Sequence, residues 1–257
     1  MHPIVAAITA RHLALLDERL PGRALGLYLT GSVGLNDFHP PDSDIDAVVV
    51  LGTPVPDPEV LRGIHGEVDA AGDGPAYDVF YLTVRQLAAP AVDGMVAPYV
   101  MHGHFDAGDG GAPVSPVLWA ELARYAVPVR AVPHLVVRDD HWALRAWTAD
   151  NLRTYWLPWV VDAESHLAAG RVGEGELDFV VTWPTLGVPR LHALLATDRL
   201  ISKSEAARYA AERFPEHARL ALRVLAHRRG DRQQFTQDDA REAVALARAV
   251  IAAAPSP

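Results

Sequence analysis

The segment from Leu27 to Val50, LYLTGSVGLNDFHPPDSDIDAVVV, limits what this chain can fold into more than any other segment. It places a glycine–serine turn after one apolar run and two alternating aspartates at the start of another. The two apolar runs predict strands at 24–29 and 45–51, joined by a loop that contains two prolines. Because side chains alternate along a strand, Asp44 and Asp46 should point to one face of the sheet.

These residue types suit phosphate and a divalent cation. Gly31 can adopt backbone angles that a Cβ forbids, so a phosphate can approach the main chain closely, and Ser32 adds a hydroxyl donor. Two carboxylates on one face suit Mg²⁺, which usually takes one or two protein carboxylates plus substrate phosphates. Asp78, on a predicted strand at 77–84, would complete the metal site or accept the proton of an attacking hydroxyl. The pattern therefore predicts metal-assisted nucleotidyl transfer.

Each part of the pattern also has a simpler interpretation. Glycine–serine turns are common, the DSDID segment can be a solvated loop that caps a strand, and Asp78 can simply face solvent. The combination favours the catalytic interpretation, because the turn, the short loop and the paired aspartates occur together between strands.

The rest of the chain predicts an α+β protein with two domains. Residues 1–135 should form a nucleotidyltransferase domain with a small mixed β-sheet and flanking helices, and residues 136–257 a helical bundle. Gly187 and Pro189 are expected to interrupt the helical pattern, and Ser202 or Ser204 to cap a later helix. The other segments assigned are helices at 4–20, 58–70 and 237–254, a turn at 72–74, a loop at 93–116, and a helix followed by a short strand within 115–131.

Composition excludes several classes of protein. Among 257 residues there is no cysteine, which excludes disulfides and cysteine-ligated zinc, and the formal net charge of −9 disfavours a sequence-independent nucleic-acid binder. The N-terminal segment is broken by charges, and no apolar run approaches the roughly 20 residues that span a membrane. We expect a cytoplasmic monomer without a membrane or nucleic-acid partner.

Two parts of the sequence resemble known enzymes. GSVGLNDFHPPDSDIDAVVV is similar to the signature of the DNA polymerase β-like nucleotidyltransferase superfamily. SPVLWAELARYAVPVRA and TLGVPRLHALLATDRLISKSEAARYAAERFP resemble the aminoglycoside adenylyltransferases that modify streptomycin and spectinomycin. The resemblance implies ATP as donor, Mg²⁺, and transfer of AMP to a hydroxyl of a cationic aminoglycoside or aminocyclitol with release of pyrophosphate.

The resemblance also assigns roles to residues. In the first domain Asp78 takes the place of the strand carboxylate regarded as the catalytic base, which is usually glutamate in the streptomycin enzymes. Arg190 and Lys203 fall where the helical domain supplies cations to the triphosphate, although a surface cation is the simpler interpretation of each. The remaining assignments are Gly31, Ser32 and Ser43 for phosphate, Asp44 and Asp46 for metal and catalysis together with Asp78, and Trp183, Glu176 and Asp178 for the acceptor.

Some alternatives stay open. His102 and His104 alternate in a loop but match no strong zinc pattern, so a place near the rim of the active site is favoured. His192 suits either a cleft between domains or a buried structural position. A nucleotidyltransferase of the same architecture could use another acceptor, such as a natural product, a nucleotide or a protein. Alternatively, the protein could be a regulator that binds nucleotide and catalyses little.

Overall fold

The computed structural model describes residues 1–40, 42–70 and 74–256. The chain forms two compact units, residues 1–140 and 141–257, and each is described by itself below. Within the described ranges, no helix combines the length and the apolar character needed to cross a membrane. The mixed sheet of the first unit and the helices of the second confirm the predicted α+β class.

The first unit is built on a mixed sheet. In the described part of the chain this sheet has six strands in the order β5-β4-β3-β2-β1-β6, with β2 and β3 parallel and every other neighbouring pair antiparallel. The strands are β1 (Ala24–Leu29), β2 (Ile45–Leu51), β3 (Tyr77–Thr83), β4 (Tyr99–Met101), β5 (His104–Asp106) and β6 (Val127–Arg130).

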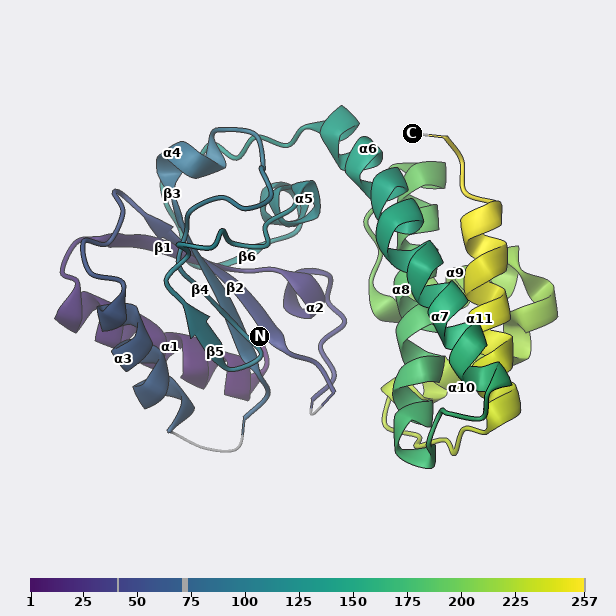
Figure 1. The fold of residues 1–257 in the computed structure, drawn as a ribbon. Coiled ribbons are helices and arrows are strands. Elements are labelled where there is room, and N and C mark those ends of the chain that lie inside the picture. The colour runs from purple at the N-terminus through teal and green to yellow at the C-terminus, as the bar shows by residue number, and fades with distance from the viewer. Residues whose placement is uncertain (41, 71–73, 257) are drawn as a thin grey trace. The chain divides into compact units, whose positions relative to one another are not determined.

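Helices cover both faces of this sheet (Figure 1). The first face packs on α1 and α3, and the opposite face packs on α4 and α5. A parallel strand pair needs a crossover connection, and α3 lies in the one between β2 and β3. The helices of this unit are α1 (Pro3–Arg19), α2 (Gly31–Gly34), α3 (Glu59–Asp69), α4 (Val84–Leu87) and α5 (Pro116–Arg124).

Alternation along β2 decides which side chains reach which face. Ile45, Ala47 and Val49 belong to the core against α1 and α3. Val48 and Val50 belong to the core on the α5 side, so Asp46, which shares their parity, also points to the α5 side. The predicted metal ligand Asp46 therefore lies on the face that α5 covers.

The first unit departs from the sequence prediction in several segments. The expected loop at 93–116 contains the short antiparallel strands β4 and β5, which have only three residues each and so give little periodic signal. The predicted strand at 77–84 ends at Thr83, which caps α4. The glycine–serine turn closes into the four-residue helix α2. Most of the turn predicted at 72–74 lies outside the described residues.

The second unit is helical. Its longest helix, α8, runs beside α9 and α11, and a π-helical segment joins α6 to α7. The elements are α6 (His141–Asn151), η1 (Leu152–Trp156), α7 (Leu157–Ala168), η2 (Glu174–Glu176), α8 (Leu177–Thr197), α9 (Lys203–Arg213), η3 (Pro215–His217), α10 (Ala218–Arg228) and α11 (Gln237–Ala252).

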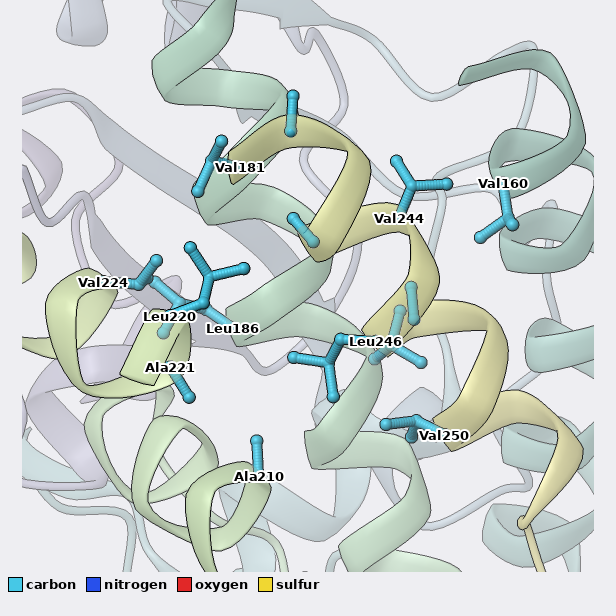
Figure 2. Packing of buried hydrophobic residues seen from close by; sticks show 14 of the residues in the cluster. Val160, Val181, Leu186, Ala210, Leu220, Ala221, Val224, Val244, Leu246 and Val250 are labelled. Atoms are coloured by element: carbon cyan, nitrogen blue, oxygen red, sulfur yellow. The ribbon is translucent and has the colours of Figure 1, made fainter. Parts of the chain in front are cut away.

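Small and branched side chains fill the core of this unit. Figure 2 shows Val181 and Leu186 of α8 among residues from α10 and α11, including Val224 and Val244. Alanines on α9, α10 and α11 are buried, which lets the helix backbones approach closely. The result is a helical scaffold whose longest helix carries one of the predicted phosphate-binding cations.

The predicted interruption at Gly187 and Pro189 is wrong, because α8 continues through both residues and through Pro184. Gly187 has a packing role instead: a Cβ at this position would lie 2.6 Å from Trp156 Cζ2. The glycine thus allows the Trp156 indole to lie against the helix. Ser202 caps α9 in a capping box with Glu205, which decides between the two serines considered.

Candidate active site

Asp46 and Asp78 are direct register partners across the parallel strands β2 and β3. Neighbouring strands lie roughly 4.8 Å apart, so their side chains leave the same face side by side. Asp44 precedes β2 by one residue and is exposed, and its charge acts on Asp78. The sheet therefore places Asp46 beside Asp78, with Asp44 near enough for its charge to act on Asp78.

Asp78 is the most enclosed of the three. It is 8% exposed, and burial is the main cause that raises the pKa of its carboxyl, with a further contribution from the charge of Asp44. The backbone N–H of His102 donates to Asp78 Oδ1 at 2.8 Å and opposes this rise. His102 has a φ of 51°, so an unusual backbone conformation presents this donor. A carboxylate with a raised pKa suits proton transfer near neutral pH.

Gly31 packs directly against Asp46. It has a φ of 52°, and a Cβ built on it would overlap the Asp46 carboxylate. Thr30 donates its backbone N–H to the Asp46 carbonyl at 2.9 Å, which ties the turn to β2. Both the backbone conformation and the lack of space therefore require glycine here.

The two serines of the motif have different surroundings. Ser32 Oγ donates to the Asp44 carbonyl at 3.2 Å, so the hydroxyl bridges the turn and the aspartate segment. Ser43 is buried, and its Oγ accepts the backbone N–H of His39 at 3.0 Å. Ser43 thus shapes the intervening loop, and its predicted contact with phosphate stays a prediction.

The donor set at this edge of the sheet fits Mg²⁺. It consists of hard carboxylate oxygens, with Asp46 and Asp78 adjacent and Asp44 close enough to perturb Asp78. Over residues 1–40, 42–70 and 74–256, no group of three or more His, Cys, Asp or Glu side chains is gathered into a metal site. Mg²⁺ usually draws part of its coordination from substrate phosphates and water, and two carboxylates suffice for that mode.

Sequence reasoning missed Glu121 of α5. This residue is 8% exposed, and its Oε2 accepts the backbone N–H of Gly31 at 3.3 Å. Glu121 and Leu122 follow Leu118 by three and four residues, so all three lie on one side of α5, which is otherwise apolar. A carboxylate at an apolar position of a helix was the signal that could have indicated it.

The predicted cations of the second unit lie close to each other. Arg190 Nε donates to the Ile201 carbonyl at 3.1 Å, which holds its side chain against the segment that leads into α9. Lys203 is the first residue of α9, two positions after Ile201. Both residues are half-buried and both make further interactions. The fold of this unit thus collects two positive charges at one place.

The three predicted acceptor residues do not form one cluster. Glu176 lines a cavity of about 660 Å³ with Trp159, Asp162 and Phe179. Trp183 stacks on Phe179 with ring centroids 5.8 Å apart, whereas Asp178 is exposed and faces His227. The Trp183 indole Nε1 is buried and has no hydrogen-bond partner within the described chain. The structure therefore places Glu176 at a cavity and Trp183 behind its aromatic wall.

The histidines considered from sequence fall into two groups. The His102 backbone contacts Asp78, which puts the 93–116 segment next to the carboxylates. His192 is buried, 2% exposed, and pairs with Tyr209 Oη at 2.7 Å and the Ala253 carbonyl at 3.2 Å. His192 therefore occupies a structural position in the second unit.

The whole chain resembles a solved adenyltransferase in structure. A crystal structure of spectinomycin adenyltransferase AAD(9) from Enterococcus faecialis, determined with ATP and spectinomycin, superposes with a TM-score of 0.66 at 15% sequence identity. The match covers 95% of this chain and 98% of that protein. No family model and no curated protein sequence matches this chain. The chain therefore shares the fold of this adenyltransferase along nearly its whole length.

Proposed function

We propose that this protein is a Mg²⁺-dependent nucleotidyltransferase that transfers AMP from ATP to a hydroxyl of a cationic aminoglycoside or aminocyclitol, such as spectinomycin or streptomycin. One observation carries the proposal: the packing of Gly31 against Asp46, next to the register partner Asp78. The shared fold with a protein whose structure contains ATP and spectinomycin supports the choice of donor and acceptor.

In this proposal the triphosphate lies at the turn formed by Gly31 and Ser32. The absence of a Cβ lets the triphosphate approach the main chain, and the Ser32 hydroxyl can exchange its bond to the Asp44 carbonyl for one to a phosphate oxygen. Asp44 and Asp46 would hold Mg²⁺. When bound, the metal supplies charge neutralisation for the triphosphate oxygens.

Asp78 acts as the general base. Its carboxylate takes the proton from the acceptor hydroxyl while that oxygen forms a bond to the α-phosphorus, the bond between the α- and β-phosphates breaks, and pyrophosphate leaves. Burial prepares this role, because it raises the pKa of the Asp78 carboxyl. The His102 backbone donor holds Oδ1, so the carboxylate is oriented in advance.

Arg190 and Lys203 supply positive charge to the triphosphate. The planar fork of an arginine can bind phosphate oxygens in a bidentate manner, and a lysine adds a compact charge. Their closeness within the second unit supports a joint role.

The acceptor would contact the cavity beside Glu176. Its wall combines the carboxylates of Asp162 and Glu176 with the rings of Trp159 and Phe179, a mixture that suits an ammonium-bearing ligand. Asp162 pairs with His166 at 3.0 Å, and Glu176 Oε2 accepts the Gly173 N–H at 2.8 Å, so a bound cation would contact the remaining carboxylate oxygens of both residues. The net charge of −9 also favours attraction of a cation.

Calorimetry tests the donor half of this proposal. We expect ATP to bind in the presence of Mg²⁺, to bind much more weakly in Asp46→Asn, and to bind normally in Asp57→Asn, a control at an exposed aspartate just before α3. Pyrophosphate release should then depend on an added aminocyclitol or aminoglycoside. If the protein binds ATP tightly but releases no pyrophosphate from it with any member of a broad acceptor panel, the result would favour a nucleotide-binding regulator.

A further inference from the structure

A second carboxylate supports the glycine–serine turn from the side of α5. Glu121 Oε2 accepts the Gly31 N–H at 3.3 Å, and Glu121 is buried at 8% exposure. One helical turn further along, the Tyr125 carbonyl oxygen would lie 3.1 Å from a Cβ built on Gly34. Thus α5 contacts both ends of α2, at its first and its last residue.

Gly31 lies between this support and the Asp46 carboxylate. The side of Gly31 that faces Asp46 has no room for a Cβ, whereas its N–H is held by Glu121. The positive φ of Gly31 is a conformation that the chain adopts readily only with glycine, and glycine loses more conformational freedom on folding than any other residue. A shift of the turn would therefore press on the Asp46 carboxylate or open a gap beside it.

We infer that Glu121 is a positioning residue for the reaction: by holding the Gly31 N–H, it fixes the turn that sets the Asp46 carboxylate. This inference rests on the proposed function for its catalytic consequence. Glu121 does not touch the metal and acts only through Gly31. Residues that orient metal ligands typically contribute about 10- to 100-fold to metal affinity.

The hydrogen bond can be observed directly. Thr30–Gly31 is the only threonine–glycine pair in the sequence, so labelling with ¹³C-carbonyl threonine and ¹⁵N-glycine isolates the Gly31 amide as a single resonance. In Glu121→Ala this amide proton should move upfield and exchange faster with solvent. In Glu121→Gln, which keeps an acceptor oxygen, and in Glu59→Gln, an exposed control on α3, it should stay close to its wild-type position.

Kinetics tests the catalytic consequence in the same full-length variants. We expect Glu121→Ala to raise the Mg²⁺ concentration for half-maximal turnover about 10- to 100-fold and to lower kcat by up to about 10²-fold, with a smaller change in KM for ATP. Glu121→Gln should recover most of both losses. A loss of folded protein would lower the apparent kcat alone and would leave the Mg²⁺ requirement and the KM for ATP unchanged.

The outcomes separate this inference from the proposed function. If the wild-type protein turns over and Glu121→Ala matches it in kcat and Mg²⁺ requirement, or if the Gly31 resonance does not move, the positioning role is wrong and the proposed function stands. Tighter ATP binding in Glu121→Ala would identify Glu121 as a competitor of the phosphates and would also overturn the inference. If the wild-type protein neither binds ATP nor turns over, the proposed function fails, and the positioning role fails with it even where the hydrogen bond is present.

Discussion

Asp46 and Asp78 stand 32 residues apart in the sequence and opposite each other in the sheet, because β2 and β3 pair in parallel with α3 in the crossover between them. Their environments differ. Asp46 is half-buried against Gly31, whereas Asp78 is buried and accepts the His102 N–H. Two neighbouring carboxylates in different environments can take different roles, one as a metal ligand and one as a base.

Substitution of Asp78 should affect chemistry more than nucleotide binding. We expect Asp78→Asn to lower kcat by about 10²- to 10⁴-fold, the usual contribution of a general base, and to change KM for ATP little. Asp78→Glu should keep part of the activity. The control is Asp57→Asn, at an exposed aspartate just before α3. Steady-state kinetics with a fixed acceptor provides the measurement, and wild-type kcat in Asp78→Asn would exclude the base role.

The same residue predicts a pH profile. Burial raises the folded-state pKa of the Asp78 carboxyl above 3.8, and the base must be deprotonated to accept a proton. The value of kcat/KM should therefore fall as the pH decreases through this raised pKa, at a higher pH than an exposed aspartate would give. An acid limb at or below pH 3.8 would show that another group limits the reaction.

Gly31→Ala should remove activity by displacing Asp46. The new Cβ would overlap the Asp46 carboxylate and would also strain a residue with positive φ. Gly22→Ala is a matched control, because Gly22 has a φ of 72° but no atom within 4 Å of the added Cβ. Both variants should lose about 1–2 kcal/mol of stability from backbone strain. Loss of ATP binding in both variants alike would mean that strain, and not the contact with Asp46, causes it.

The paired cations of the second unit should be needed for ATP. Arg190→Gln and Lys203→Gln are each expected to raise KM for ATP, and the effect should shrink at high salt because part of it is electrostatic. Arg190→Lys should restore little, since a lysine lacks the planar fork. Arg241→Gln, which changes an exposed arginine paired with Asp238, serves as the control. An unchanged KM in both Arg190 and Lys203 variants would leave them as structural cations.

Acid should destabilise the first unit through two buried histidines. His12 bridges Tyr77 Oη and Tyr81 Oη, and His65 Nε2 also contacts Tyr81 Oη at 2.6 Å. Burial lowers the pKa of His65 from 6.5 to about 4 and lowers that of His12 well below 6.5. Between the unfolded-state pKa of 6.5 and the lowered folded-state pKa, the unfolded chain binds protons that the folded chain does not. The free energy of unfolding is therefore highest above pH 6.5 and falls as the pH decreases toward 4.

For His65 alone this loss amounts to roughly 3 kcal/mol. Hydrogen exchange followed by mass spectrometry, corrected for the intrinsic rate at each pH, should show the loss in peptides from β2 and β3. His65→Gln should reduce the slope of stability against pH. If peptides from α11 lost protection equally over this range, the buried histidines would not be the cause.

Local patterns were enough to predict much of the fold. The bounds of β1 and β2 follow from short runs of β-branched and apolar residues, and the helical character of 141–257 follows from periodicity. Alternation along a strand is visible in sequence and predicts a shared face for Asp44 and Asp46, whereas Asp78 is predicted only as the carboxylate of the next strand. The three-residue strands β4 and β5 were missed, because they depend on pairing with β3 and not on their own composition.

Long-range contacts set the limit of the prediction. Gly187 and Pro189 look like breaks in a helix, yet α8 continues through both, and Gly187 instead leaves room for the Trp156 ring. Glu121 acts on Gly31 across 90 residues of sequence, and no local pattern contains that contact. Likewise, the hydrogen bond from Arg190 to the Ile201 carbonyl brings this cation near Lys203 only once α8 and α9 pack.

The mass of the reaction product tests the central claim most directly. The protein is incubated with ATP, Mg²⁺ and spectinomycin, streptomycin or related aminocyclitols, and the acceptors are then analysed by mass spectrometry. We predict that at least one acceptor gains one adenylyl group in amounts equal to the pyrophosphate released, and that Asp46→Asn yields none. Unmodified acceptors across the panel, with wild-type protein that binds ATP, would contradict the claim.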